Sequence, residues 1–377
     1  MTLTVGILLV GMFLIVAAEL AARMYVRHSP YRVLPPGRKD VMHFDMSVLP
    51  SMEPTTVHKV NRHGERGSER PHGDTAFRVL VAGGSSAGCY LLDQKTAWAG
   101  ALERDLQELP HFCSRRVHVG NVGQSSIDSG SLLVTLERIL PQEHGLDLLL
   151  LMVGASDVLR WLEIEAPPER AAEAIAIDEC FARHPEMKFG LHPRTWALAT
   201  LYRWRRDAKG KVRTKSGQRY AVARRLRAEA LETRTLVPKA DVVIKRFESN
   251  LRACIKLAQK HARNVVVVRQ PWFRKAEYLP EELAQFWSGS VGDAYTQNVT
   301  AFYSPEVVSA LMNQIDRSAA DVAAQLGIPS VDVNASLAPS NSNYMDQFHF
   351  TPQGSRIVAR CVRDQIAQKL GINRELL

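Results

Sequence analysis

The chain has 377 residues, of which 46% are hydrophobic and 23% charged, and its formal net charge is +9. This length suits one large α/β domain with added segments, and no internal period indicates a repeat array. The five cysteines are widely spaced and form no CxxC pair, which argues against a zinc ribbon or a dithiol redox site. The positive charge alone does not choose among nucleic acid, anionic lipid and an acidic substrate.

The first segment of the chain is apolar on all faces. From Leu3 to Ala18 every residue is apolar or small except Thr4, and Glu19 follows. Such a run is just long enough to span a bilayer if Glu19 lies near the interface. No basic region precedes the run, and the residues after it fit a cleavage site poorly. We therefore expect residues 1–28 to be an uncleaved single-pass anchor rather than a signal peptide.

The rest of the chain divides into a linker and a domain. Residues 29–77 are rich in Pro, Gly, His and charge, which is typical of a linker that packs on a domain surface. In residues 78–377, short apolar runs alternate with helical stretches, which predicts βαβ units and a doubly wound parallel sheet. The predicted strands are 78–82, 117–122, 146–153, 265–268 and 331–333, and the predicted helices are 97–109, 132–140, 242–261, 305–326 and 352–370.

An insertion at about 158–240 concentrates the basic residues. The stretch 201–227 contains eleven Lys or Arg and one acid, Asp207, so its net charge of +10 exceeds that of the whole chain. The stretch is either a solvated face or loop, or a surface for anionic lipid head groups or an acidic polymer. Trp204 and Tyr220 lie among the charges, but no known nucleic-acid motif is present, so no nucleic-acid partner is expected.

A serine follows the first predicted strand. The sequence Gly83-Gly84-Ser85-Ser86 begins where the apolar run 78–82 ends, which places Ser85 at the carboxyl end of the sheet, where ligands bind in open α/β folds. The helix N-terminus that follows favours developing negative charge. Without a Gly-Lys-[Ser/Thr] sequence the turn is not a phosphate-binding P-loop.

An aspartate and a histidine lie three residues apart near the other end of the chain. Asp346 and His349 precede Pro352, which is typical of a first helical position, so both side chains can occupy one loop. A serine hydroxyl needs a base to take its proton, and that base needs a carboxylate to hold its tautomer. The alternative is a helix-capping aspartate beside a surface histidine.

Taken together, these motifs resemble the SGNH (GDSL-like) hydrolase family, and the resemblance covers about residues 75–375. Ser85 matches the nucleophile position, Gly123 the oxyanion glycine after the second strand, and Asp346 and His349 the last block. The sequence Gly154-Ala155-Ser156-Asp157 matches the family's Gly-x-Asn-Asp block, and Val60–Gly67 is similar to an Asn-x-x-Gly-x-Arg-Gly stretch of anchored bacterial members.

The resemblance implies a flavodoxin-like three-layer α/β/α fold with a mostly parallel sheet. It also implies that Ser85 is the nucleophile, His349 the general base and Asp346 the residue that orients it. Ser85, Gly123 and Ser156 would form the oxyanion hole, and neither a metal nor a cofactor is expected. Ser156 stands where the family has asparagine, and losing one such donor costs ~2.7–4 kcal/mol of transition-state stabilisation.

The predicted function is a membrane-anchored serine esterase that acts on an ester-bearing small molecule, lipid or glycan. An O-acyltransferase with the same triad and a catalytically inactive binding module are the alternatives. Five basic residues follow the span and none precedes it, so the positive-inside rule places the domain in the cytoplasm. Membrane-tethered members of the family often work outside the cytoplasmic membrane, so the side of the membrane stays open.

Overall fold

The computed structural model describes residues 2–71, 76–169, 175–186, 190, 192 and 195–371. Its centre is a five-stranded sheet in the order β10-β8-β5-β3-β4, in which every neighbouring pair is parallel. Numbered along the chain, these strands lie in the 2-1-3-4-5 order of flavodoxin-like doubly wound sheets. The predicted fold class is therefore confirmed. The strands are β3 (Phe77–Gly83), β4 (Val117–Asn121), β5 (Leu146–Met152), β8 (Ala262–Val268) and β10 (Ser330–Val331).

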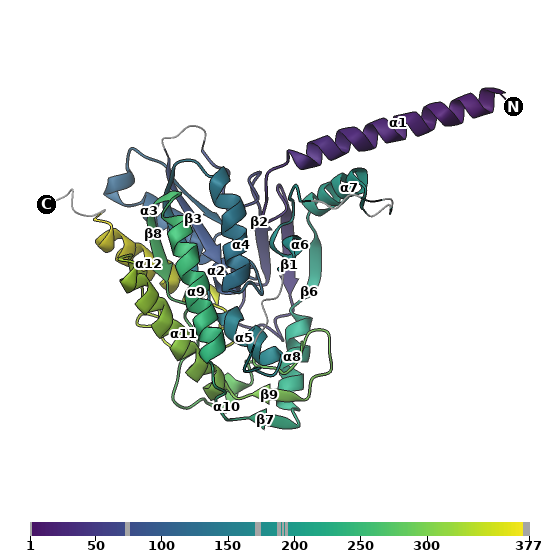
Figure 1. Ribbon diagram of the computed structural model, residues 1–377. Coiled ribbons are helices and arrows are strands. Elements are labelled where there is room, and N and C mark those ends of the chain that lie inside the picture. The colour runs from purple at the N-terminus through teal and green to yellow at the C-terminus, as the bar shows by residue number, and fades with distance from the viewer. Residues whose placement is uncertain are drawn as a thin grey trace.

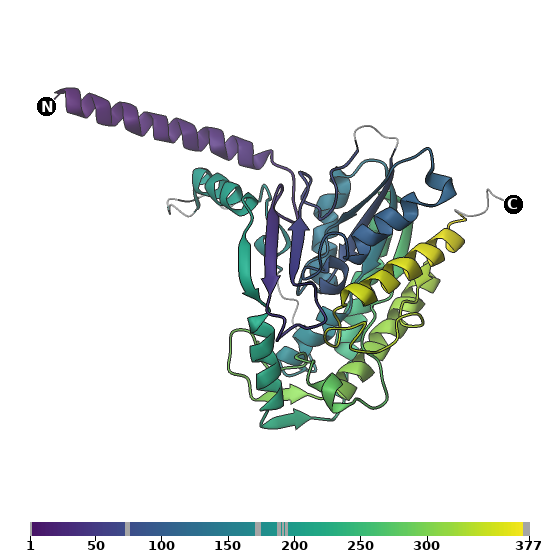
Figure 2. The ribbon, with the colours of Figure 1, turned by 180° about the vertical axis from the view of Figure 1, so that it is seen from behind.

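Helices cover both faces of the sheet, which gives three layers (Figures 1 and 2). One face carries α3 (Trp98–Gln107) and α12 (Pro352–Lys369), which pack against each other. The other face carries α4 (Ser129–Ile139), α9 (Asp241–Ala258) and α11 (Pro305–Gln325). These elements lie within a few residues of the predicted ranges.

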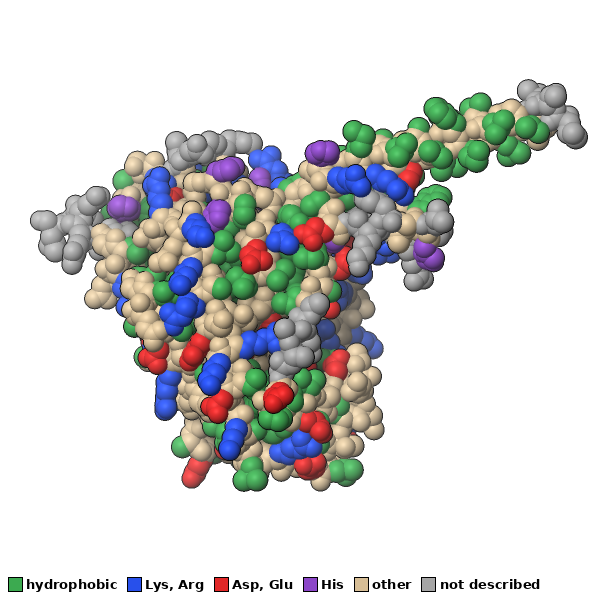
Figure 3. Space-filling view, in the orientation of Figure 1, with side chains coloured by type: hydrophobic (Ala, Val, Ile, Leu, Met, Phe, Trp, Pro, Cys, Tyr) green, Lys and Arg blue, Asp and Glu red, His purple; other side chains and the backbone are tan. Residues whose placement is uncertain are grey.

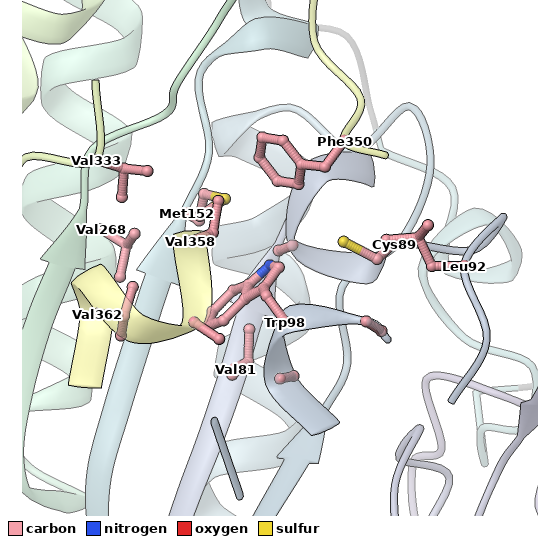
Figure 4. Close-up of a cluster of buried hydrophobic side chains, with 14 of the residues drawn as sticks. Val81, Cys89, Leu92, Trp98, Met152, Val268, Val333, Phe350, Val358 and Val362 are labelled. Carbon is pink, nitrogen blue, oxygen red and sulfur yellow. The ribbon is translucent and has the colours of Figure 1, made fainter. Parts of the chain in front are cut away.

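Strand β5 shows why the sheet must be covered on both sides. All seven of its residues are buried. Leu148, Leu150 and Met152 belong to one hydrophobic cluster, and the alternate residues Leu149 and Leu151 belong to the other, as the two-residue period of a strand requires. Figure 4 shows the first cluster, in which α12 and the first turn of α3 close over β3, β5 and β8.

The segment predicted as a linker contains part of a second sheet. Strands β1 (Lys39–Phe44) and β2 (Thr55–Lys59) pair antiparallel, and β6 (Val212–Ser216) of the basic insertion pairs parallel with β1. Met42 and Phe44 of β1 are buried in the same hydrophobic cluster as Leu148, Leu150 and Met152 of β5. The segment and the insertion therefore stabilise each other, although about 170 residues separate them along the chain.

The insertion continues from α5 (Ala155–Glu163) and includes further short elements. These are α6 (Ile177–Cys180), α7 (Ala197–Ala208), β6, α8 (Gln218–Ala228) and β7 (Glu232–Arg234), which pairs with β9 (Ala301–Tyr303). The remaining elements are α2 (Ser85–Gly88), α10 (Pro280–Leu283) and two 3₁₀ turns, η1 (Pro110–Phe112) and η2 (Leu140–Gln142).

Helix α1 (Thr2–Arg27) projects away from the domain, and its apolar side chains are exposed (Figures 1 and 3). By length and composition, Thr4–Arg27 is long and apolar enough to be a membrane anchor or a signal sequence. Near its end α1 packs on α7, where the Glu19 carboxylate accepts hydrogen bonds from the N–H groups of Ala197 (2.8 Å) and Leu198 (3.0 Å). Glu19 thus satisfies two of the unpaired N–H groups at the start of α7.

Candidate active site

The turn that carries Ser85 is fixed by glycine and by the neighbouring strand. Gly83 has φ +155°, and a Cβ atom on it would lie 1.8 Å from the carbonyl oxygen of Met152. The N–H of Gly84 donates to the same oxygen at 3.0 Å. The end of β3 is therefore held against the end of β5, and Ser85 starts α2 at the carboxyl edge of the sheet. The chain reverses its strand order between β3 and β5, and ligands bind in such a crevice.

The loop of Asp346 and His349 is folded by its own hydrogen bonds. Asp346 Oδ1 accepts from the backbone N–H groups of Phe348 (2.8 Å) and His349 (2.5 Å). The N–H of Met345 donates to the carbonyl of His349 at 2.9 Å. Thr351 then caps α12 by accepting the N–H of Gly354. The helix-capping role is thus taken by Thr351, which leaves the second oxygen of Asp346 for another partner.

The structure brings Ser85, His349 and Asp346 into one hydrogen-bonded series. His349 Nδ1 lies 2.7 Å from Asp346 Oδ2, and His349 Nε2 lies 2.8 Å from Ser85 Oγ. Asp346 is buried, whereas 28% of the His349 side chain is exposed. This order of hydroxyl, imidazole and carboxylate is the arrangement that activates a serine nucleophile.

The surroundings of His349 set its basicity. Burial lowers the pKa of the imidazole, but the charge of Asp346 and the hydrogen bond to it raise the pKa by more, and Arg219 opposes them. The net pKa lies above the ordinary value of histidine. The ring of Trp287 stacks on the imidazole, with centroids 6.0 Å apart and planes at 17°. A ring held on one face and at both nitrogens has little freedom to turn away from Ser85.

Ser86, the next residue, has a structural role. Its hydroxyl is buried and donates to the carbonyl of Phe348 at 3.1 Å. Its own carbonyl accepts the indole N–H of Trp98 at 3.0 Å. Ser86 therefore joins the serine turn to the histidine loop and to the core.

Gly123 makes a close contact instead of offering a free donor. A Cβ atom on Gly123 would lie 2.5 Å from the nitrogen of Gly88, so glycine is needed where the two backbones meet. The N–H of Gly123 already donates to Asn121 Oδ1 at 2.8 Å. The Nδ2 group of Asn121 donates to the carbonyl of Ala87, also at 2.8 Å. An incoming oxyanion would have to compete with Asn121 for the Gly123 N–H.

Ser156 lies at the start of α5, beside the nucleophile turn. Its Oγ is 4.0 Å from the position that a Cβ atom would take on Gly84, and the side chain is half-buried. Within the described residues, neither the Ser156 hydroxyl nor the Ser85 N–H has a hydrogen-bond partner. The adjacent Asp157 instead accepts from the N–H and hydroxyl of Ser129, and burial and the nearby Asp128 raise the pKa of Asp157 to about 7.

Arg66 in the upstream motif holds the loop that follows the nucleophile. The side chain is buried and donates to the carbonyls of Gly88 (2.7 Å), Cys89 (2.5 Å) and Leu92 (2.6 Å). Its Nε donates to Gln94 at 3.0 Å. Burial lowers the pKa of Arg66 to about 10, so the group stays charged at neutral pH. Sequence reasoning found the motif but not this role.

A cavity of about 30 Å³ opens at Ser85 and His349. Its wall includes Tyr90 and, from helix α8 of the insertion, Arg219 and Tyr220. The basic stretch has no motif that relates it to the site, so the sequence does not identify which of its residues line the cavity. Over the described part of the chain, no group of three or more His, Cys, Asp or Glu residues is arranged to hold a metal ion.

Comparisons with known proteins find no matching family model and no matching curated protein. Among solved structures, the chain is similar to Axe2, an acetylxylan esterase from Geobacillus stearothermophilus, with 14% identity, a TM-score of 0.43 and coverage of 78% of this chain and 96% of that chain. It is also similar to a member of the lipolytic protein G-D-S-L family from Veillonella parvula (10%, 0.42, 77% and 97%). A third is LAE5, an α/β hydrolase from the metagenome of Lake Arreo (11%, 0.44, 78% and 96%).

The GDSL family of the second structure is the one that the sequence motifs predict. With identities of 10–14% and TM-scores below 0.5, these likenesses transfer no residue roles to this chain. The roles proposed below rest on the geometry described above.

Proposed function

We propose that the protein is an SGNH-type serine ester hydrolase. The observation that carries the proposal is the series of short hydrogen bonds from Ser85 through His349 to Asp346 at the carboxyl edge of the sheet. His349 Nε2 takes the hydroxyl proton while Ser85 Oγ attacks the acyl carbonyl. Asp346 keeps the proton on Nδ1 and stabilises the imidazolium. The same imidazolium then protonates the leaving alcohol, and water releases the acyl group by the reverse sequence.

The tetrahedral oxyanion needs hydrogen-bond donors. The Ser85 N–H and the Ser156 hydroxyl are free to donate, and Gly123 is a third donor once its N–H leaves Asn121 Oδ1. No metal enters this scheme, since the three side chains supply the nucleophile, the base and the orienting carboxylate. The expected substrate is an O-acyl group on a glycan, a lipid or a small molecule.

We also infer that α1 anchors the enzyme in a membrane as a single-pass helix. Its exposed apolar side chains and its projection from the domain support an anchor (Figure 3). The basic residues of α7 and the turn after it would then lie beside the lipid head groups, because α7 packs on the end of α1. An anionic lipid surface is therefore the second proposed partner.

The test uses the detergent-solubilised full chain, since removing α1 also removes the Glu19 carboxylate that caps α7. Wild type is treated with a fluorophosphonate probe and assayed with 4-nitrophenyl acetate in the presence of a metal chelator. Labelling of Ser85 with ester hydrolysis supports the proposal. Transfer of acetyl to an added sugar in place of water would identify an acyltransferase. Absence of both labelling and turnover would leave a binding module.

A further inference from the structure

Arg219 is a charged residue at the catalytic cavity that the proposed reaction does not use. It lies in the first turn of α8 and lines the cavity together with Ser85 and His349. Its charge also acts on the His349 imidazole, whose pKa it lowers. A guanidinium group this close to a catalytic pair can contact a substrate bound there.

A stack of aromatic rings fixes the position of Arg219 relative to His349. Trp287 stacks on His349, and Tyr220 packs on Trp287 with centroids 4.6 Å apart. The Arg219 guanidinium lies over Tyr220 at 4.8 Å and over Tyr295 at 5.5 Å. Such cation–π contacts orient the group without neutralising its charge.

The hydrogen-bonding capacity of Arg219 is largely unused. One of its five N–H donors reaches the Tyr220 oxygen at 2.6 Å, and no carboxylate in the described part of the chain forms an ion pair with it. Burial raises the pKa of Tyr220, so this phenol stays protonated and keeps its own O–H to donate.

Two other arginines of the same helix are used within the protein, and the exposed Arg225 is not among the residues that line the cavity. Arg224 donates to the carbonyls of Val48 and Met345, and Arg227 donates to that of Ser288. These two guanidinium groups fasten α8 to the domain. Arg219 is the arginine of α8 that faces the cavity.

We propose that Arg219, with the hydroxyl of Tyr220, binds a negatively charged oxyacid group of the substrate beside the scissile ester. The planar guanidinium matches a carboxylate, phosphate or sulfate group, to which its free N–H groups can donate in pairs. The inference rests on the proposed function and names its substrate class: an ester with an anionic group in its acyl or its alcohol part.

The test compares esters that differ by one charge. Phenyl acetate is the neutral reference, 4-acetoxybenzoate has its carboxylate in the alcohol part, and monophenyl succinate has it in the acyl part. Wild type should prefer one of the two anionic esters, and which one identifies the part of the substrate that Arg219 contacts. In Arg219→Gln the ratio of kcat/KM for that ester to kcat/KM for phenyl acetate should fall about 10- to 100-fold, mainly through KM. Arg225→Gln removes an exposed charge from the same helix and should keep the wild-type ratio.

An unchanged ratio in Arg219→Gln would overturn the inference while leaving the esterase in place. If instead wild type hydrolyses no ester and Ser85 is not labelled, the proposed function fails and the anion site is tested by binding. Calorimetric titration with benzoate and with phenyl phosphate would then be compared for wild type, Arg219→Gln and Arg225→Gln. Weaker binding in Arg219→Gln alone supports the site, and equal binding in all three rules it out.

Discussion

Ser86 Oγ donates a hydrogen bond to the carbonyl oxygen of Phe348, the residue before His349, at 3.1 Å. The serine turn and the histidine loop, about 260 residues apart in sequence, are thereby joined next to the Ser85–His349 hydrogen bond. Ser86 is buried, and its hydroxyl donates to this carbonyl, whereas the hydroxyl of Ser85 is the one beside His349 Nε2. This pairing assigns different roles to two adjacent serines.

We therefore expect Ser85→Ala to abolish fluorophosphonate labelling and esterase activity. Ser86→Ala should retain labelling but lower the stability, since the Phe348 carbonyl loses a buried partner at a cost of about 1–3 kcal/mol. Labelling and thermal unfolding of both variants check the assignment. Loss of labelling in folded Ser86→Ala, with labelling kept in Ser85→Ala, would place the nucleophile one residue later.

The pH dependence of the reaction should follow His349. The base must be neutral, and its pKa in the folded protein is raised above the ordinary value, with burial outweighed by the charge and hydrogen bond of Asp346. The rate constant kcat/KM should therefore fall as pH falls through this raised pKa. Asp346→Asn removes the groups that raise the pKa, so the midpoint should move to lower pH while kcat drops by ~10⁴-fold.

A second group titrates near neutrality and needs a control. Burial and Asp128 raise the pKa of Asp157 to about 7. In Asp157→Asn the acidic limb of the profile should remain, because it belongs to His349. If the limb disappears in Asp157→Asn and is unmoved in Asp346→Asn, the titrating group is Asp157.

Ser156 should be a weak oxyanion donor. A serine hydroxyl is shorter than an asparagine side chain and must rotate to donate, and Gly123 offers no compensation while its N–H is bonded to Asn121. Ser156→Asn should therefore raise kcat by about tenfold or more, since a missing donor costs ~10²–10³ in kcat. Ser156→Ala should lower kcat. Thermal unfolding first checks that both variants are folded, and their kcat values on 4-nitrophenyl acetate are then compared with that of wild type. A lower kcat in Ser156→Asn would mean that the serine is fitted to its substrate.

Arg66 should stabilise the loop that follows the nucleophile. Arg66→Met leaves the carbonyls of Gly88 and Leu92 without a donor, whereas the Cys89 carbonyl keeps the Leu92 N–H at 3.0 Å, and each unsatisfied group costs about 1–3 kcal/mol. We expect a loss of ~3 kcal/mol or more in the free energy of unfolding, measured with denaturant. Arg62→Met is the matched control, because Arg62 forms an exposed ion pair with Glu69 that is worth under ~1 kcal/mol. Equal losses in the two variants would deny Arg66 this role.

Local patterns were sufficient to predict most of the fold and the hydrogen-bonded series of the site. The apolar run before Ser85 and the Asp346-x-x-His349 spacing each describe a few consecutive residues, and the strand order brings these segments together. The basic stretch was harder to interpret from the sequence, because its residues have different roles in the structure. Arg219 lies at the cavity and Arg224 donates to backbone carbonyls, yet a charge count treats them alike.

Contacts between segments that are far apart in the sequence could not be predicted from local sequence patterns. Strands β1 and β2 share a sheet with β6, which lies about 170 residues further along the chain, and composition alone suggested a linker. The aromatic stack from His349 through Trp287 to Tyr220 joins three separate segments. The bond between Asn121 and the Gly123 N–H is the exception, since an asparagine that accepts the N–H two residues later is a local pattern.

The structure changes which basic residues should meet a membrane. Three arginines of α8, Arg219, Arg224 and Arg227, are used at the cavity or in the domain, whereas α7 lies beside the end of α1 (Figure 1). Residues 1–18 can be removed while Glu19, Ala22 and Val26 still pack on α7. This shortened chain should bind vesicles rich in anionic lipid, and more weakly as salt rises, because charge attraction is screened over ~8 Å at physiological salt.

The basic residues of α7 and the turn after it should provide most of that binding. Replacing five of them by Gln should weaken binding by a few kcal/mol, at ~1 kcal/mol for each charge near the surface; these are Arg203, Arg205, Arg206, Lys209 and Lys211. A control variant loses the same charge from exposed positions outside α7 and the turn after it, with Gln at Arg225, Lys245, Lys256, Lys260 and Arg360. Vesicle co-sedimentation should separate the two, since only charges close to the lipid gain energy from it. Equal binding by both variants would make α7 a solvated face and leave α1 as the proposed membrane contact.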